Sequence, residues 1–279
     1  MKTVQKKHKK KVPRWQMIVF VSLILITSAV LGFLYGFRVK TVTVEGNIHY
    51  TEDEVKEMVM TGFLGDNSLA LSITKREVAY TDVPFLNTIQ VRMTGRDSIR
   101  IRVNEKSVVG YVEYDSAYWY FNRDGIVVER CDTPAMTAEE RIAKEESINA
   151  AENGGGSTIA AEITTRNYVP EVRGFSFEQV VLGEQLPVED DSIFNSLYSI
   201  NQMMNKDNIP SDFVLFDQDY NIYLYYGTAV VQLGQDDRLE EKMTVLASII
   251  PKMKGMSGVL HLEKYTGDSG QVVFEKSDS

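Results

Sequence analysis

The first forty residues show an abrupt change in polarity. Residues 15–37 contain no charged side chain and are rich in Ile, Val, Leu and Phe, and Arg14 and Arg38 flank them. An uncharged apolar helix of about 20 residues is long enough to cross the roughly 30 Å hydrocarbon core of a bilayer. The pattern therefore predicts a single transmembrane helix over residues 15–37.

Directly after this segment the spacing of apolar residues changes. Residues 39–45 form an alternating β-branched run that ends at Gly46-Asn47, which predicts a strand and a turn. Thr51 and Glu54 have the spacing of a capping box, in which the two side chains satisfy the first free amides of a helix. A helix is therefore expected from this point, followed by a second short helix at about residues 72–80.

Two further runs alternate strictly between apolar and polar residues. Residues 89–93 and 99–103 lie on either side of the sequence Gly95-Arg96-Asp97, which is typical of a turn. A period of two around a glycine turn predicts a hairpin with one buried face. The order β-α-α-β-β predicts a small α+β module over residues 38–106.

The remaining chain reads as a mixed α/β-sheet domain over residues 107–265, followed by a C-terminal strand and tail over residues 266–279. Two amphipathic helices are expected, one around Ile193 to Met204 and one from Leu239 to Met253. Short strands are expected at residues 108–112, 117–121, 125–129, 213–216, 222–226, 228–233, 259–265 and 272–274.

Residues 132–165 have a different composition, because they are rich in Glu and Ala and include three consecutive glycines, Gly154 to Gly156. Such a segment is expected to be a flexible, partly helical insertion. Its glycines are not followed by Gly-Lys-Ser/Thr, so they do not form a phosphate-binding loop.

The charge is distributed unevenly. Residues 1–14 hold seven Lys or Arg and no acid, although the whole chain has a formal net charge of −9. Positive residues beside a span stay on the cytoplasmic side, so residues 1–14 are expected to be a cytoplasmic tail and the larger part of the chain extracytoplasmic. A basic arm for nucleic acid is an alternative, but the apolar segment that follows favours the membrane.

A cleaved signal peptide is another alternative, with Thr27-Ser28-Ala29 as its cleavage site. The apolar stretch exceeds the about 7–15 residues of a signal core, so an uncleaved anchor is favoured. Ser28, Gly32 and Gly36 recur every four residues, a pattern that permits close packing between membrane helices. The anchor also implies contact with membrane lipid.

No catalytic, metal or cofactor site is expected from the residue types. The chain has one cysteine, Cys131, and only three histidines, at positions 8, 49 and 261. Residues 217–221 begin like a calcium loop, but Ile222 stands where that loop requires glycine and Thr228 where it requires glutamate. A polar hairpin turn is the preferred interpretation.

Six short sequences of the chain together carry a resemblance to a known family. They are Val-Glu-Gly-Asn (44–47), Val-Pro-Phe-Leu-Asn-Thr-Ile-Gln-Val (83–91), Ile-Arg-Ile-Arg-Val-Asn-Glu-Lys (99–106), Tyr-Phe-Asn-Arg-Asp-Gly-Ile-Val-Val (120–128), Val-Gln-Leu-Gly (231–234) and Leu-Glu-Glu-Lys-Met (239–243). In this order, and behind an anchor, they resemble the FtsQ/DivIB family. Residues 38–106 are similar to its POTRA domain and residues 107–265 to its β domain.

The resemblance implies a non-enzymatic division-site scaffold in the bacterial cytoplasmic membrane, located at the division septum and helping to regulate septum formation. It implies membrane partners of the FtsL/DivIC and FtsB type, with no cofactor, small-molecule substrate or nucleic acid. Open sheet edges can pair with another chain. The hypothesis places partner binding at the last strands, at Val259, Leu260, Leu262, Tyr265, Val272, Val273 and Phe274.

Two other functions remain open. One is a POTRA-containing export or membrane-assembly chaperone, although such proteins usually carry tandem modules or a barrel and only one module is recognised here. The other is an anchored wall-active enzyme, for which no G-x-S-x-G nucleophile motif is present.

Overall fold

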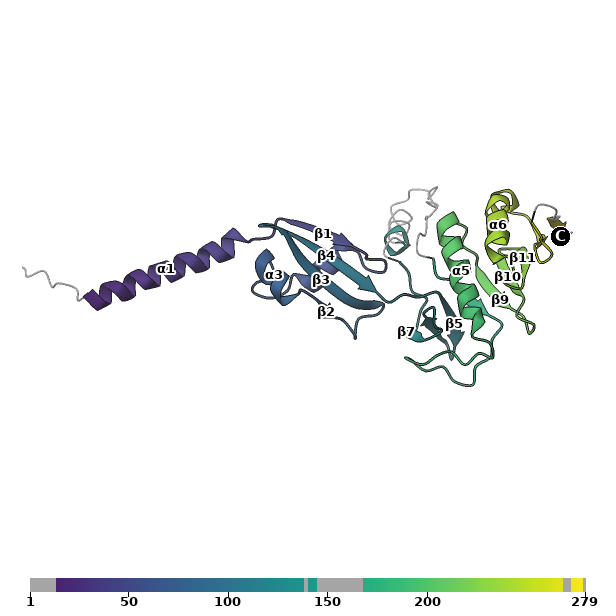
Figure 1. Ribbon diagram of the computed structural model, residues 1–279, viewed down its shortest axis with the longest axis horizontal. Coiled ribbons are helices and arrows are strands. Elements are labelled where there is room, and N and C mark those ends of the chain that lie inside the picture. Colours follow the sequence, from purple (N-terminus) through teal and green to yellow (C-terminus); the bar gives the residue numbers. More distant parts are fainter. Residues whose placement is uncertain (1–13, 138–139, 145–167, 268–271, 278–279) are drawn as a thin grey trace, which may run out of the picture. The chain divides into compact units, whose positions relative to one another are not determined.

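The structure, a computed structural model, describes residues 14–137, 140–144, 168–267 and 272–277 (Figure 1). It is a mixed α/β chain with an N-terminal apolar helix, a four-stranded sheet and a nine-stranded sheet, which confirms the predicted fold class. The predicted basic tail, except for Arg14, lies outside the described residues. So do residues 145–165 of the predicted insertion and parts of the predicted C-terminal tail.

The apolar helix α1 (Arg14–Gly36) is 23 residues long, and none of its residues is buried. Its most apolar window has a mean hydropathy of 2.7, and no other helix in the described part of the chain is long and apolar enough to cross a membrane. Trp15 and Tyr35, near its two ends, are 64% and 73% exposed. Helix α1 is therefore a candidate membrane anchor, and its ends agree with the sequence prediction to within one residue.

The four-stranded sheet has the strand order β1-β4-β3-β2. Strand β1 runs parallel to β4, with Thr41 opposite Ser98, whereas β2 is antiparallel to β3. Strands β3 and β4 are the predicted hairpin, and most of the apolar residues expected on its inner face are buried. Met93 is the exception, because it is 41% exposed. The bounds are β1 (Thr41–Glu45), β2 (Val78–Ala79), β3 (Leu86–Gly95) and β4 (Ser98–Glu105).

Two short helices, α2 (Glu52–Val59) and α3 (Ser68–Thr74), precede β2. The prediction of the second helix at residues 72–80 was wrong in its position. Helix α3 starts earlier because the Asn67 side chain accepts a hydrogen bond from the Ala70 amide, at 2.9 Å, and so caps the helix there. The chain then extends into β2, which occupies part of the range predicted as helix.

The nine-stranded sheet has the order β13-β12-β11-β10-β9-β8-β5-β6-β7. Most neighbours are antiparallel, but β5–β8, β8–β9 and β11–β12 are parallel. The strands are β5 (Gly110–Tyr114), β6 (Ala117–Phe121), β7 (Val127–Cys131), β8 (Glu171–Arg173), β9 (Phe213–Phe216), β10 (Ile222–Tyr226), β11 (Ala229–Gly234), β12 (Gly258–His261) and β13 (Val273–Lys276).

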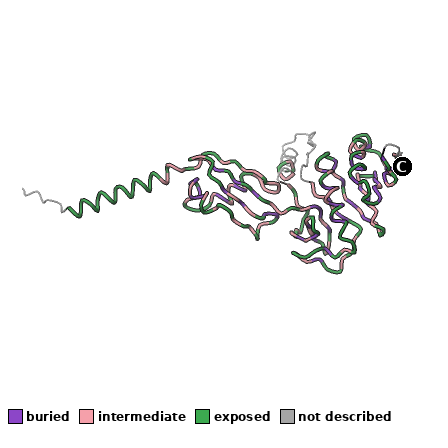
Figure 2. Tube along the Cα trace, in the orientation of Figure 1, coloured by how far each residue is buried: buried purple, intermediate pink, exposed green. Residues whose placement is uncertain are grey.

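Helices α5 (Ser192–Asp207) and α6 (Leu239–Met253) pack on this sheet, close to their predicted positions. Helix α6 is the crossover between the parallel strands β11 and β12, because parallel neighbours require a long connection. Leu197 and Met243 from the two helices join Val214 and Leu224 from the strands in one buried cluster. Figure 2 colours buried residues purple, and purple stretches occur along these helices and strands.

The chain divides into two compact units whose limits differ from a simple cut along the sequence. The first unit comprises residues 1–45, 52–79 and 88–103, and the second comprises residues 46–51, 80–87 and 104–279. Two loops that the sequence assigns to the α+β module, 46–51 and 80–87, therefore belong to the second unit.

Candidate protein-binding strand edge

Strand β13 is the outermost strand of the nine-stranded sheet, and only β12 pairs with it among the strands that the structure describes. The two are antiparallel, with Gly258 opposite Lys276 and His261 opposite Val273. An outermost strand leaves one row of backbone N–H and C=O groups without a partner strand. The other long side of β13 is therefore a candidate site for strand addition.

The register shows which residues face this open side. The Ser277 amide donates to the Ser257 carbonyl at 3.1 Å, so these two residues form a hydrogen-bonded pair. In an antiparallel ladder such pairs alternate with pairs whose backbone groups point away from each other. The backbone groups of Val273 and Glu275 consequently face β12, whereas those of Phe274 and Lys276 face outward.

The structure separates the predicted partner-binding residues into two groups. Leu260 and Leu262 are 0% exposed and belong to the buried core, so their side chains cannot contact a partner, which corrects that part of the hypothesis. Strand β12, which carries Val259 and Leu260, lies inside the sheet between β11 and β13 and offers no free edge.

The other predicted residues lie at or near the edge. Val273 is 49% exposed, whereas Val272 and Phe274 are partly buried and pack on the core. Tyr265 is partly buried, and its amide donates to the Leu262 carbonyl at 3.1 Å, in the segment that leaves β12. The candidate binding edge therefore consists of the four residues of β13, Val273 to Lys276.

Close contact between the last two strands depends on a glycine. Gly258 has φ +147°, and a Cβ atom there would lie 2.2 Å from the carbonyl oxygen of Glu275. Only glycine tolerates both conditions.

His261 lies between two carboxylates, with Nδ1 3.0 Å from Glu263 Oε1 and Nε2 3.5 Å from Glu275 Oε2. The contact with Glu275 joins β12 to β13, whereas Glu263 lies in the segment directly after β12.

The three small residues predicted for helix packing all lie on α1. Ser28 and Gly32 are exposed, and no heavy atom comes within 4 Å of a Cβ atom built on Gly32. Gly36 differs, because its carbonyl accepts a hydrogen bond from Arg96 Nε at 2.6 Å. Close packing against another membrane helix therefore remains a prediction for Ser28 and Gly32, whereas Gly36 contacts Arg96 of the same chain.

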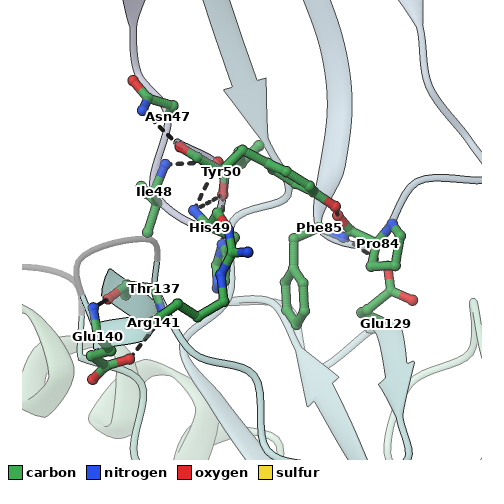
Figure 3. A network of polar contacts seen from close by, with 11 residues as sticks. Asn47, Ile48, His49, Tyr50, Pro84, Phe85, Glu129, Thr137, Glu140 and Arg141 are labelled. Carbon is green, nitrogen blue, oxygen red and sulfur yellow. Dashed lines mark hydrogen bonds and ion pairs between the residues drawn. The ribbon is translucent and has the colours of Figure 1, made fainter. Parts of the chain in front are cut away.

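A buried polar network, which the sequence did not reveal, forms around Glu105 at the end of β4. Figure 3 labels two of its partners, Ile48 and His49. The carboxylate, whose side chain is 3% exposed, accepts hydrogen bonds from the amides of Ile48 and His49 at 2.7 and 3.0 Å. It also lies 2.6 Å from His49 Nδ1. Glu105 thereby closes the loop of residues 46–51, and we call this group the Glu105 network.

The histidine ring extends this network toward the nine-stranded sheet. His49 stacks on Phe85 at a centroid distance of 4.2 Å, and Phe85 meets Tyr120 of β6 edge-on at 4.9 Å. The Phe85 amide donates to Glu129 Oε2 at 3.0 Å, and Arg141 Nη2 donates to the His49 carbonyl at 2.7 Å. The two loops are thus fixed to the second unit by hydrogen bonds as well as by ring contacts.

Metal binding and nucleophilic catalysis each need particular side chains in a suitable environment. Among the residues that the structure describes, no group of three or more His, Cys, Asp or Glu side chains is placed to hold a metal ion. A Ser-x-x-Lys spacing occurs at Ser72 and Lys75, but Ser72 Oγ donates to the Leu69 carbonyl within α3 at 2.8 Å. Burial, followed by Glu129 and Asp132, raises the pKa of the Cys131 thiol to about 11, opposite to what a nucleophile needs.

Comparison with protein families identifies the first module. Residues 37–106 match the family described as POTRA domain, FtsQ-type. Comparison with curated proteins gives no significant match. The chain therefore carries a POTRA domain, a class of domain that mediates contacts between proteins, directly after a candidate membrane anchor.

The particular type is the one found in bacterial division proteins. An apolar N-terminal helix, an FtsQ-type POTRA domain and a large mixed sheet follow one another, and this arrangement fits the FtsQ/DivIB family. The resemblance seen in the sequence is thereby confirmed for the POTRA domain. FtsQ-type POTRA domains belong to a non-enzymatic scaffold family, which supports a role in protein interaction related to division.

Proposed function

We propose that this protein is a non-enzymatic scaffold of the bacterial division site. Helix α1 crosses the cytoplasmic membrane once, with the basic tail in the cytoplasm and residues 38–279 outside. The protein binds small membrane division proteins of the FtsL/DivIC and FtsB type and so helps to regulate septum formation. The observation that carries the proposal is the FtsQ-type POTRA match at residues 37–106, directly after the candidate anchor.

Strand addition to β13 is the proposed mode of partner binding. The outward backbone groups of Phe274 and Lys276 provide donors and acceptors for an extended segment, and Val273 adds an exposed apolar side chain. Glu275 and Lys276 are exposed and charged, which also limits uncontrolled pairing of an edge. A partner segment with complementary charges would form ion pairs with these same two residues.

The test uses two variants of one exposed residue. Lys276→Pro removes an outward N–H and places a ring on the open side, whereas Lys276→Ala removes the charge and keeps the N–H. The proline variant loses one backbone hydrogen bond to the partner, and its ring keeps the partner strand from approaching closely. Binding should therefore weaken on the order of tenfold relative to Lys276→Ala. Binding is measured with purified full-length protein and the FtsL/DivIC- and FtsB-type proteins of the parent cell, in detergent or nanodiscs.

Thermal unfolding of both variants provides the control for folding. If Lys276→Pro and Lys276→Ala bind their partners within twofold of each other, the β13 edge is not the binding site. If the full-length wild-type protein binds none of these partners, the proposed partner class is wrong. Loss of envelope proteins without a division defect on depletion would favour the export chaperone instead.

A further inference from the structure

The outer end of α1 is joined to the POTRA domain by hydrogen bonds to its last carbonyl groups. Asn67 Nδ2 donates to the Phe33 carbonyl at 2.9 Å, and the Ser68 amide donates to the Phe37 carbonyl at 2.7 Å. The end of a helix leaves such carbonyls without intrahelical partners. The start of α3 therefore lies against the end of the anchor, within the first compact unit.

The turn of residues 62–66 immediately precedes this contact and carries Phe63. This ring is 86% exposed, more than any other large hydrophobic side chain that the structure describes. Phe63 is four residues from Asn67, so at most about 14 Å of extended chain separates the two Cα atoms. An exposed aromatic side chain is thus held close to the point where the anchor ends.

The backbone of this turn has a defined conformation that two glycines and two hydrogen bonds specify. Gly62 has φ +81°, and a Cβ atom on Gly65 would lie 2.7 Å from the backbone of Met60. The Gly65 amide donates to the Gly62 carbonyl at 3.1 Å, and the Asn67 amide donates to the Leu64 carbonyl at 3.0 Å. Phe63 is consequently exposed by a defined turn and not by a loose loop.

The length of α1 places this turn near the membrane surface. Its 23 residues span about 35 Å at 1.5 Å per residue, slightly more than the roughly 30 Å hydrocarbon core. The last helical turn, which includes Phe33, therefore reaches the level of the lipid headgroups. Because Asn67 bonds to Phe33, the turn of residues 62–66 lies at about the same level.

The neighbouring side chains suit this level. Tyr35 is 73% exposed, and the Arg96 guanidinium lies 5.7 Å from the centroid of the Phe37 ring. Arg38 is within 3.3 Å of Asp66, with both side chains more than half exposed. Aromatic and basic residues are the types that concentrate at membrane–water interfaces. A lipid surface is therefore a better fit to this patch than a protein groove.

We propose that Phe63 inserts into the outer headgroup boundary of the bilayer that α1 crosses. The POTRA domain then has a second attachment beside the anchor, which fixes the tilt of its sheet relative to the membrane. The proposal rests on the proposed placement of α1 across the membrane. Its chemistry is that of a phospholipid surface, with the ring in the acyl boundary and the arginines among the phosphates.

The test measures the depth of spin labels in the full-length protein. Cys131→Ser removes the native thiol, and nitroxide labels are placed singly by Phe63→Cys, Leu182→Cys and Leu25→Cys. Leu182 is a matched control, because it is 56% exposed in a loop of the second unit, and Leu25 lies midway along α1. The proteins are reconstituted in phosphatidylethanolamine–phosphatidylglycerol liposomes, and power saturation is recorded with oxygen and with a water-soluble nickel chelate.

The label at position 63 should show a ratio of oxygen to nickel accessibility several-fold above that at position 182. A ratio equal to that of position 182 would overturn the proposal, because the side chain would then be in water. Shielding from both reagents would also overturn it, because a protein would then cover Phe63. A water-like ratio at position 25 would show that α1 is not in the bilayer, and both this proposal and the proposed topology would fail.

Discussion

Replacing Glu105 tests whether the buried network stabilises the second unit. The Glu105→Ala variant leaves the amides of Ile48 and His49 and the His49 ring without their acceptor in a site where the carboxylate is 3% exposed. Each buried donor left unsatisfied costs about 1–3 kcal/mol, so a loss of about 3–5 kcal/mol in the free energy of unfolding is expected. Glu105→Gln keeps a carbonyl acceptor and should lose roughly 1–2 kcal/mol.

The assay is urea unfolding of the segment 38–279, followed by tryptophan fluorescence. The chain has two tryptophans, and Trp119, the one outside α1, lies in the same compact unit as Glu105. Its signal therefore reports on the correct transition even if the two units unfold separately. Glu113→Ala, an exposed position on β5, is the control and should change stability by less than about 0.5 kcal/mol. If Glu105→Ala behaved like this control, the stabilising role of the network would be refuted.

Two further predictions concern Lys242, which is buried, and Cys131, which is partly buried, in the second unit. Lys242 is 0% exposed, and its ammonium donates to the Leu233 and Gln235 carbonyls at 2.9 and 3.2 Å, so Lys242→Ala should destabilise the same transition by about 3–5 kcal/mol; an unchanged urea midpoint would contradict this. Because the pKa of Cys131 is raised to about 11, alkylation by iodoacetamide at pH 8 should be about 100-fold slower in folded than in unfolded protein and should accelerate as the pH rises toward that pKa. Equal rates in the two states would contradict the raised pKa of the thiol.

Local patterns predicted most of the elements because each depends on a few neighbouring residues. The alternation in residues 89–93 and 99–103 was sufficient for the β3–β4 hairpin, and the apolar stripes were sufficient for α5 and α6. The second POTRA helix was misplaced because its start depends on the Asn67 cap, which lies outside the range chosen from the apolar pattern. The sequence Asn67-Ser68 is itself a typical helix start, and it marks the position where α3 begins.

Features that depend on sheet order or distant pairing could not be predicted in the same way. Leu260 was predicted at the partner edge, but the parallel crossover through α6 places β12 inside the sheet, and a linear sequence does not specify that order. Glu105 and His49 are 56 residues apart and carry no motif, so only the fold brings them together. The sequence around a Glu or a His does not show whether that side chain is buried in a network or exposed to solvent.

The central claim is that this protein acts at the division site, and its location in the cell tests that claim most directly. A fluorescent protein fused to the N-terminus of the full chain should form a band at midcell in dividing cells of the parent organism. A signal spread evenly around the envelope throughout the cell cycle would contradict the account.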